Sequence, residues 1–405
     1  MTEKMTTPEN SAPLKVSIVG AGIAGLAAAI ALRRNGHIVE IFEAVEVLAE
    51  IGAAISVPVN AQCVLEHFGY SKANLGSVNW DGLLNLDAIT GNARTAKWLI
   101  SGMDEKPLAQ NILCHRTDLR NELERLALGP GDGPPPVLHL SSKVRECDVE
   151  KGLLELENGR VIQSDVILGA DGISSMVRTR ILGHVQKSIS CGWSCYRALI
   201  DVATLDGIPD LAWLWDVVSG PRNIAAHVGP FRMLFLYRCR GGTLLNFAAF
   251  VEDPDHDDPG WCPQAKRAEW QLRTVPALPT WARGRAVPIG DAAHGTLPTL
   301  AQDAAMGIEE GAALAAFLPP GTTRADVPAR LEAYQAHRKV RGEFVGRESL
   351  EQAMIPEKRG EHIRCVLIHG CFAAKEMQEY MMGYDAAKAA EECFEEKFGQ
   401  RGLAA

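Results

Sequence analysis

The chain has 405 residues, of which 47% are hydrophobic and 22% charged, a composition typical of a globular protein with two domains. Its formal net charge of −9 argues against nucleic-acid binding, because phosphate contacts need a basic surface. The sequence has no run of 18 apolar residues and no apolar N-terminal segment. We therefore expect a cytoplasmic protein, without a membrane span, whose partner is a small molecule.

A strand–helix–strand unit is predicted near the N-terminus. Residues 1–13 are polar and predict a disordered tail, whereas residues 14–20 form a short apolar run typical of a buried strand. Good helix formers follow over residues 23–36 and end at an Asn-Gly pair. Residues 38–44 predict a second strand, which completes a βαβ unit within about thirty residues.

The turn between the first strand and the helix reads GAGIAG, with glycines at positions 20, 22 and 25. In a dinucleotide-binding fingerprint the first glycine makes the turn, the second lets the backbone approach a pyrophosphate, and the third lets helix and strand pack closely. Glu43 ends the second strand, where an acid accepts hydrogen bonds from a ribose. The motif predicts a bound dinucleotide but does not separate FAD from NAD.

The rest of the chain is divided by turn-rich breaks at residues 128–136, 251–260 and 318–328. Strands are predicted at residues 166–172, 211–218, 233–239 and 243–251, the last three in an antiparallel sheet, and a long helix at residues 328–354. The ten cysteines include no CxxC pair, the closest being Cys191 and Cys195. We therefore expect free thiols and no metal site.

Two further segments repeat the pattern of an apolar strand, a tight Gly/Asp turn and a helix. They are DVILGADGISSMVRTRILG at residues 165–183 and AVPIGDAAHGTLPTLAQDAAMGIEEGAALAAFL at residues 286–318. Each turn puts an acid, Asp171 or Asp291, at the carboxyl end of a strand, which is the edge of an α/β sheet where ligands bind.

Together, the three segments resemble the single-component FAD-dependent aromatic monooxygenases, the salicylate-hydroxylase-like group A flavoproteins of the PHBH fold that are common in fungal metabolite pathways. The resemblance runs from residue 14 to about residue 395. It implies an α/β fold in which a GR2-type Rossmann-like FAD-binding domain carries an inserted, mainly antiparallel substrate sheet and a helical C-terminus. The implied ranges are 14–185 and 285–350 for FAD, 186–284 for substrate and 351–405 for the C-terminal helices.

The resemblance also implies the residues that hold a tightly but non-covalently bound FAD. Asp171 and Gly172 match a DG motif that serves FAD and transiently docked NAD(P)H, and Asp291 matches a GD motif whose carboxylate holds the ribityl hydroxyls. From the residues alone, an arginine at the start of a surface helix is the favoured interpretation of Arg116. The complete expected set is Gly20, Gly22, Gly25, Glu43, Gly52, Ala54, Arg116, Asp171, Gly172, Asp291 and Ala304.

In this family NAD(P)H reduces the flavin, O2 adds to give a C4a-hydroperoxide, and an aromatic or polyketide-like substrate is hydroxylated or epoxidised. The resemblance places Arg197 and Tyr237 where an arginine and a tyrosine orient and deprotonate a phenol. Read without the resemblance, Arg197 is an edge cation and Tyr237 a core aromatic. His294 is expected to be structural, and His227 to lie in the core or at its rim.

Asp303 departs from the family, which has a glycine close to the flavin at this position. Three interpretations stay open: an N-cap that points away from the flavin, a charge that faces the flavin N1 edge and disfavours reduction, and a general base for substrate. The N-cap is the plainest of the three. The alternative function for the whole chain is an FAD-binding scaffold with lost or altered redox activity that catalyses a cyclisation or isomerisation.

Overall fold

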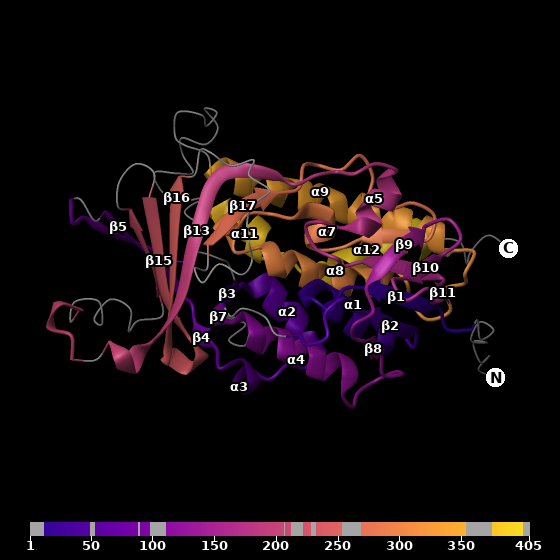
Figure 1. The fold of residues 1–405 in the computed structure, drawn as a ribbon, viewed down its shortest axis with the longest axis horizontal. Coiled ribbons are helices and arrows are strands. Elements are labelled where there is room, and N and C mark those ends of the chain that lie inside the picture. The colour runs from indigo at the N-terminus through magenta and orange to yellow at the C-terminus, as the bar shows by residue number, and fades with distance from the viewer. Residues whose placement is uncertain are drawn as a thin grey trace, which may run out of the picture.

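The computed structural model describes residues 12–48, 53–87, 90–97, 111–205, 207–211, 222–227, 232–252, 269–353 and 375–399. Figure 1 shows two parts side by side: a set of long strands at one end, and a parallel sheet with most of the helices at the other. The two parts are built from interleaved stretches of the chain, so residues far apart in the sequence meet where the parts join.

The parallel sheet has five strands in the order β18-β12-β1-β2-β8. Their bounds are Lys15–Val19 for β1, Ile38–Phe42 for β2, Val137–His139 for β8, Val166–Gly169 for β12 and Ala286–Pro288 for β18. All four neighbouring pairs are parallel. Strands β1, β12 and β18 are short, mainly apolar and almost entirely buried, which is the condition that favours a parallel sheet, whereas β8 at one edge is partly exposed.

Two helices, α1 (Ile23–Arg34) and α8 (Asp303–Phe317), pack together beside this sheet (Figure 1). A Cβ on Gly307 would lie 2.8 Å from the Ala24 Cβ, and one on Gly311 would lie 2.7 Å from the Ala27 backbone. Glycine at these two positions therefore sets how closely the helices approach. The start of α8 is in consequence held near the turn that opens α1.

Further helices and small sheets surround this core. The helices are α2 (Val59–Phe68), α3 (Lys72–Leu75), α4 (Arg116–Leu128), α5 (Met176–Leu182) and α7 (Asp291–His294). One antiparallel sheet holds β9 (Val144–Asp148), β10 (Leu153–Leu156) and β11 (Val161–Gln163), and another holds β3 (Ala54–Val57), β7 (Ile112–His115) and β4 (Val78–Asn79).

The long strands form a seven-stranded sheet in the order β17-β13-β16-β15-β14-β5-β6. Their bounds are Gly82–Asp87 for β5, Ala93–Lys97 for β6, Ile189–Asp201 for β13, Arg222–His227 for β14, Arg232–Cys239 for β15, Leu244–Glu252 for β16 and Glu269–Thr274 for β17. Every pair is antiparallel except β14 with β5. The predicted ranges assign residues 82–97 to the FAD-binding part, whereas hydrogen bonding joins β5 and β6 to this sheet.

The other predicted elements compare as follows. The mixed α/β fold with an antiparallel sheet and a helical C-terminus is confirmed, as are the strands at residues 233–239 and 243–251. The strand predicted from residue 211 does not begin there, because Leu211 ends a 3-10 helix (Pro209–Leu211), and residues 212–218 lie outside the described ranges.

The C-terminal helices are α9 (Val327–Ala353), α11 (Lys375–Met382) and α12 (Ala386–Phe398). Helix α12 packs on the core through Ala386 and Ala390, which are fully buried and lie one turn apart. Over the ranges that the structure covers, none of the helices is long and apolar enough to cross a membrane. The seven cysteines in those ranges are free thiols.

Candidate functional site

The first element of the site is the glycine turn between β1 and α1. Gly20 has φ +107°, and a Cβ there would lie 2.3 Å from the carbonyl oxygen of Ala170, the residue that follows neighbouring β12. A Cβ on Gly25 would lie 2.2 Å from the Gly20 oxygen, whereas one on Gly22 would meet nothing within 4 Å. The turn is thus tight where it faces protein and open at Gly22, where a bound group can approach the backbone.

The start of α1 is suited to an anion. Its N-cap, Gly22, offers no side chain to cap the helix, and its first turn contains no acidic residue. Glu43 is tied to the same turn, because its Oε2 accepts a hydrogen bond from the Ala21 N–H at 2.8 Å. Helix N–H groups beside a positioned carboxylate are the donors and acceptor that a pyrophosphate and a ribose require.

The DG and GD turns lie next to each other because β12 and β18 are neighbours in the parallel sheet. Asp171 caps α5, since its Oδ2 accepts hydrogen bonds from the Met176 N–H at 2.7 Å and the Val177 N–H at 3.1 Å. Asp291 begins α7 directly after Gly290, whose φ is +58° and whose N–H donates to Glu310 Oε2 at 2.7 Å.

Arg178 lies near both of these acids and was not singled out from the sequence. The residue is 2% exposed, and its guanidinium donates to the Ala292 carbonyl oxygen at 2.9 Å. Burial lowers the pKa of Arg178, while the charges of Asp171 and Asp291 act in the opposite direction. The sequence signal for Arg178 was its position in the helix that follows the DG turn. The sequence pattern alone does not separate a buried arginine at this position from one on the surface.

Asp303 is the first residue of α8, and the N-cap of that helix is Gln302, which makes no side-chain capping bond. The N-cap interpretation of Asp303 is therefore wrong, because the residue lies inside the helix, one position beyond the N-cap. The pKa of Asp303 is raised well above its ordinary value by burial and by Asp291, against the attraction of Arg116 and Arg197. The residue is half-buried by surface area, but its carboxyl group is surrounded by protein atoms.

The predicted substrate residues share one face of the seven-stranded sheet. Tyr237 pairs with Asn246, which pairs with Leu199, so these side chains point the same way, and Arg197 lies two residues from Leu199 on the same strand. The charge of Arg197 acts on Tyr237 as well as on Asp303. The sheet face thus extends from Tyr237 to the surroundings of Asp303.

Ala54, at the start of β3, connects this face to the cofactor half. The Tyr237 hydroxyl donates to the Ala54 carbonyl oxygen at 3.1 Å, and Asn246 Oδ1 accepts from the Ala54 N–H at 3.4 Å. Burial raises the pKa of Tyr237 and outweighs the opposing effect of Arg197, so the phenol stays protonated at neutral pH. Tyr237 is a donor in this arrangement and not a base.

The remaining predicted residues are placed as follows. Arg116 begins α4 and Ala304 is the second residue of α8, both at helix starts that face the same junction, and Gly172 sits in its turn with φ +73°. His294 is buried, and its Nε2 lies 2.7 Å from Glu310 Oε1, which is a structural position. His227 ends β14. Gly52 lies outside the described residues.

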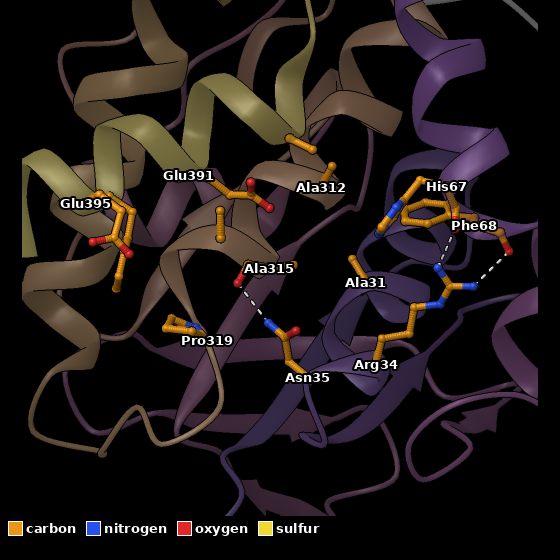
Figure 2. A pocket seen from close by; sticks show the side chains of 13 residues that line it. Ala31, Arg34, Asn35, His67, Phe68, Ala312, Ala315, Pro319, Glu391 and Glu395 are labelled. Atoms are coloured by element: carbon orange, nitrogen blue, oxygen red, sulfur yellow. Dashed lines mark hydrogen bonds between the residues drawn. The ribbon is translucent and has the colours of Figure 1, made fainter. Parts of the chain in front are cut away.

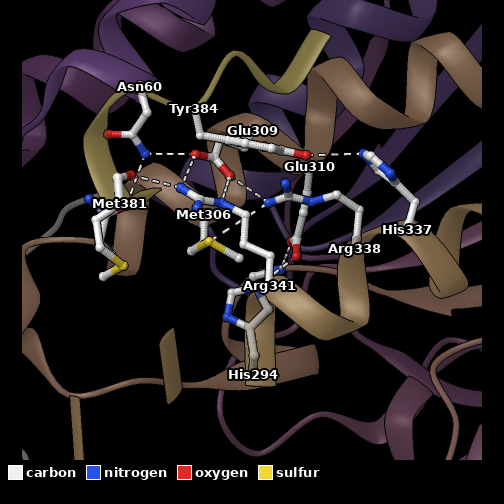
Figure 3. Close-up of polar contacts among 12 residues, drawn as sticks. Asn60, His294, Met306, Glu309, Glu310, His337, Arg338, Arg341, Met381 and Tyr384 are labelled. Atoms are coloured by element: carbon white, nitrogen blue, oxygen red, sulfur yellow. Dashed lines mark hydrogen bonds and ion pairs between the residues drawn. The ribbon is translucent and has the colours of Figure 1, made fainter. Parts of the chain in front are cut away.

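Figure 3 shows a second cluster of charges on α8, further along the helix than Asp303. The fully buried Glu309 carboxylate accepts hydrogen bonds from Arg338 at 2.7 Å, from Arg341 at 2.8 Å and from Asn60 at 2.6 Å. Burial alone raises the pKa of Glu309, but the two arginines reverse this and lower it to about 2. Arg341 also donates to the Tyr380 and Met381 carbonyl oxygens and so fixes α11 to the core.

A cavity of about 300 Å³ lies between α1, α2, α8 and α12, away from all the predicted site residues (Figure 2). Two polar residues of its lining are already hydrogen-bonded to the backbone: Arg34 donates to the His67 carbonyl oxygen at 2.7 Å, and Asn35 Nδ2 donates to the Ala315 carbonyl oxygen at 2.8 Å. These bonds join helix ends to one another, so the cavity is a gap under packed helices and not part of the site.

The residues at the junction fit FAD. The open side of Gly22 leaves room beside the uncapped helix start, and Glu43 provides an acceptor next to it. Two buried amide groups, Gln302 Nε2 and Asn246 Nδ2, have no hydrogen-bond partner among the described residues, although their side chains are at most 1% exposed. Buried amides of this kind are satisfied when a polar group binds beside them.

The chain resembles several known proteins. The model of the NAD(P)-binding Rossmann-like domain matches residues 18–67. Hispidin-3-hydroxylase of Neonothopanus nambi is 36% identical over 96% of this chain and 98% of that protein. The FAD-dependent monooxygenase cfoG of Aspergillus candidus is 31% identical over 83% of this chain and 85% of its own.

Solved structures show the same fold at lower identity. FqzB superimposes with a TM-score of 0.75 at 22% identity, covering 98% of this chain and 97% of its own. CtdE in complex with FAD gives 0.73 at 21% identity, covering 95% and 99%. A salicylate hydroxylase substrate complex gives 0.70 at 22% identity, covering 94% and 98%.

The fold and the FAD-fitting junction define a flavoprotein of the salicylate-hydroxylase type. The chain belongs to the FAD-dependent monooxygenases, as the identity over nearly its whole length to hispidin-3-hydroxylase shows. FAD as cofactor and NAD(P)H as electron donor are confirmed with the family. The alternative of a scaffold without redox activity is not favoured, since the relatives are monooxygenases.

Proposed function

We propose that this monooxygenase hydroxylates a small phenol-bearing aromatic or polyketide-like molecule, held between the seven-stranded sheet and FAD. The proposal is carried by the shared face of Arg197, Tyr237 and Asn246, which meets the cofactor half at Ala54. Hispidin, 3-hydroxybenzoate and salicylate, named in the relatives and structures that resemble this chain, are the first substrates to test.

We assign the FAD contacts to residues from five segments of the chain. They are Gly20, Gly22, Gly25 and Glu43 at the first turn, Gly52 and Ala54 before and in β3, Arg116 at the start of α4, and Asp171, Gly172, Asp291 and Ala304 at the later turns. When bound, FAD supplies electron transfer from NAD(P)H and activation of O2. The chain supplies the donors and acceptors that hold the cofactor and the sheet that covers it.

Arg197 and Tyr237 are proposed to orient the substrate. A guanidinium beside a phenol oxygen favours the phenolate, which makes the ring a better nucleophile. Tyr237 is protonated and already donates to Ala54, so it fixes the position of the sheet face relative to the cofactor half and leaves its oxygen as an acceptor. The proton of the substrate then leaves to solvent, not toward Tyr237.

The test compares Arg197→Gln and Tyr237→Phe with Tyr196→Phe. Tyr196 is the matched control because it adjoins Arg197 on β13 but is 36% exposed on the opposite face. We expect kcat/KM for hydroxylation to fall about 10- to 100-fold in the first two variants and to stay within about twofold in the control. FAD content, read from the visible spectrum, should persist in all three.

If kcat/KM for hydroxylation is the same in Tyr237→Phe as in Tyr196→Phe for every substrate that is hydroxylated, the assignment of the substrate face is contradicted. Product mass and NMR identify whether oxygen enters as a hydroxyl or an epoxide. The predicted domain ranges and the cytoplasmic location remain proposals, which limited proteolysis of the holoenzyme and microscopy of a tagged chain would check.

A further inference from the structure

Ala54 opens β3, which is an edge strand of its three-stranded sheet and lies between the long strands and α2 (Figure 1). On its inner side β3 pairs with β7, and just before it the Ala53 carbonyl oxygen accepts from the Arg116 N–H at 2.9 Å. Backbone groups on the open side of an edge strand have no neighbouring strand to pair with. Because Ala54 is only 5% exposed, its N–H and C=O need partners from the protein.

Two side chains of the seven-stranded sheet provide these partners. Tyr237 on β15 donates from its hydroxyl to the Ala54 carbonyl oxygen at 3.1 Å, and Asn246 on β16 accepts from the Ala54 N–H through Oδ1 at 3.4 Å. Tyr237 and Asn246 lie directly opposite each other across β15 and β16, so both reach the same residue. Together they take the place of the neighbouring strand that this edge lacks.

Asn246 differs in burial from the other two residues of the predicted substrate face. It is 1% exposed, whereas Arg197 and Tyr237 are half-buried. A backbone N–H can only donate, so the bond to Ala54 fixes the amide of Asn246 with its oxygen toward β3 and its nitrogen away from it. The amide is thus buried and oriented by the backbone of the cofactor half, and it is not open to a substrate.

We propose that Asn246 is a positioning residue for FAD, which it serves by holding the Ala54 N–H in place. The proposal rests on the assignment of Ala54 to the FAD site under the proposed function. Ala54 is joined to the sheet by Asn246 and Tyr237, and the residue before it is joined to Arg116, which is also assigned to FAD. Loss of the Asn246 bond leaves the start of β3 less firmly held and weakens FAD binding, while the groups that orient the substrate stay unchanged.

The experiment compares two variants of Asn246 that have opposite consequences for this bond. Asn246→Leu has a similar size but no acceptor, so the buried Ala54 N–H is left without a partner. Asn246→Asp keeps an oxygen in the place of Oδ1, and burial favours the neutral form of its carboxyl group, so the bond is retained. The control Asn85→Leu makes the same exchange on β5, which β14 and β15 separate from β16.

Two properties of the full-length holoenzyme are measured. They are the dissociation constant of FAD, from flavin fluorescence on dilution, and the rate of hydrogen exchange in the peptide that contains the Ala54 amide. For Asn246→Leu we expect the dissociation constant to rise about 5- to 20-fold, with faster exchange at Ala54. For Asn246→Asp and Asn85→Leu we expect both values to stay within about twofold of the wild type.

The kinetics separate positioning of FAD from orientation of the substrate. At saturating FAD and substrate, kcat for hydroxylation by Asn246→Leu should return to within about twofold of the wild type. Arg197→Gln should show the opposite pattern, with a lower kcat/KM and an unchanged affinity for FAD.

The proposal is overturned if Asn246→Leu binds FAD as tightly as the wild type, or if it binds FAD more weakly without faster exchange at Ala54. It is also overturned if Asn246→Asp releases FAD as readily as Asn246→Leu, because the acceptor would then not be the cause. The proposed function fails by a different result: the wild-type holoenzyme hydroxylates none of the phenols, although the two Asn246 variants still differ in their affinity for FAD.

Discussion

Helix α8 carries two acidic groups in poorly solvated surroundings whose pKa values move in opposite directions. At Glu309 two arginines, Arg338 and Arg341, lower the pKa to about 2 (Figure 3). At Asp303 the charge of another acid, Asp291, adds to the effect of burial, and the pKa is raised. Burial is the first cause in both cases, and it favours the neutral acid in both. The neighbours, and not the depth, therefore decide which carboxyl group is charged.

The two groups differ in how far their surroundings compensate a negative charge. Glu309 is ionised at neutral pH and joins α8 to α9 and, through Arg341, to α11. Asp303, at the start of α8, is incompletely compensated by Arg116 and Arg197. The comparison fails if Glu309 titrates at neutral pH or if the pKa of Asp303 is not raised.

The largest effect on the free energy of unfolding is expected where Glu309 meets its two arginines. Arg341→Met leaves the buried Glu309 with one guanidinium fewer and releases two carbonyl groups of α11, so the free energy of unfolding should fall by about 3–5 kcal/mol. Chemical unfolding of the holoenzyme measures this. Arg347→Met on the same helix removes an arginine whose side chain is 58% exposed, and it should change stability by less than about 1 kcal/mol. Similar losses in both variants would show that the Glu309 cluster contributes no more than a surface pair.

Acid titration tests the contacts of Glu309 in the wild type, without a substitution. The pKa of Glu309 is lowered from its ordinary 4.5 to about 2, so its contribution is present above pH 4.5 and is lost as the pH falls toward 2. The shift corresponds to about 3 kcal/mol, read as a slope in the free energy of unfolding against pH. Glu309→Gln should flatten this slope while lowering stability at neutral pH. An unchanged slope in Glu309→Gln would place the acid sensitivity elsewhere.

His294 is a third buried titratable group, and its neighbour Glu310 shifts its pKa in the opposite direction to burial. Burial lowers its pKa and Glu310 raises it more, so the pKa is raised overall. The contribution of the pair is therefore present below pH 6.5 and is lost as the pH rises through the raised value. His294→Gln should cost about 1–3 kcal/mol at pH 6 and remove this alkaline loss, whereas His184→Gln, at an exposed histidine, should do neither. Persistence of the alkaline loss in His294→Gln would assign it to another group.

The smallest effect is expected at Asp303, at the start of α8. The charge of Arg197 lowers the pKa of Asp303 and opposes the effect of burial, so Arg197→Gln should raise that pKa further. The carbonyl band of the protonated acid in infrared difference spectra, followed against pH, measures this change. Arg240→Gln, which breaks an exposed pair with Asp118, serves as the control and should leave the titration of the band unchanged. A fall in the pKa of Asp303 in Arg197→Gln would mean that the arginine stabilises the protonated acid.

The sequence by itself determined the parts of the fold that are encoded locally. Strands 15–19 and 38–42, the helix between them and the glycine turn follow from a stretch of about thirty residues, because tight turns need glycine and buried parallel strands need continuous apolar runs. The DG and GD turns were found in the same way, and with them the family. The prediction that strand 211–218 begins at Leu211 was wrong, since an apolar run does not by itself separate a strand from the end of a 3-10 helix.

The tertiary structure alone decided which side chains meet. Asp291 and Asp303 stand on different helices, and the arginines whose charges act on Asp303 come from the start of α4 (Arg116) and from β13 (Arg197). No local pattern distinguishes an N-cap aspartate from one inside the first helical turn, and so the N-cap interpretation failed. The partners of Glu309 and the two bonds from the sheet to Ala54 likewise come from distant segments. Protonation depends on the charges within a few ångströms, and these are set by packing and not by neighbours in the chain.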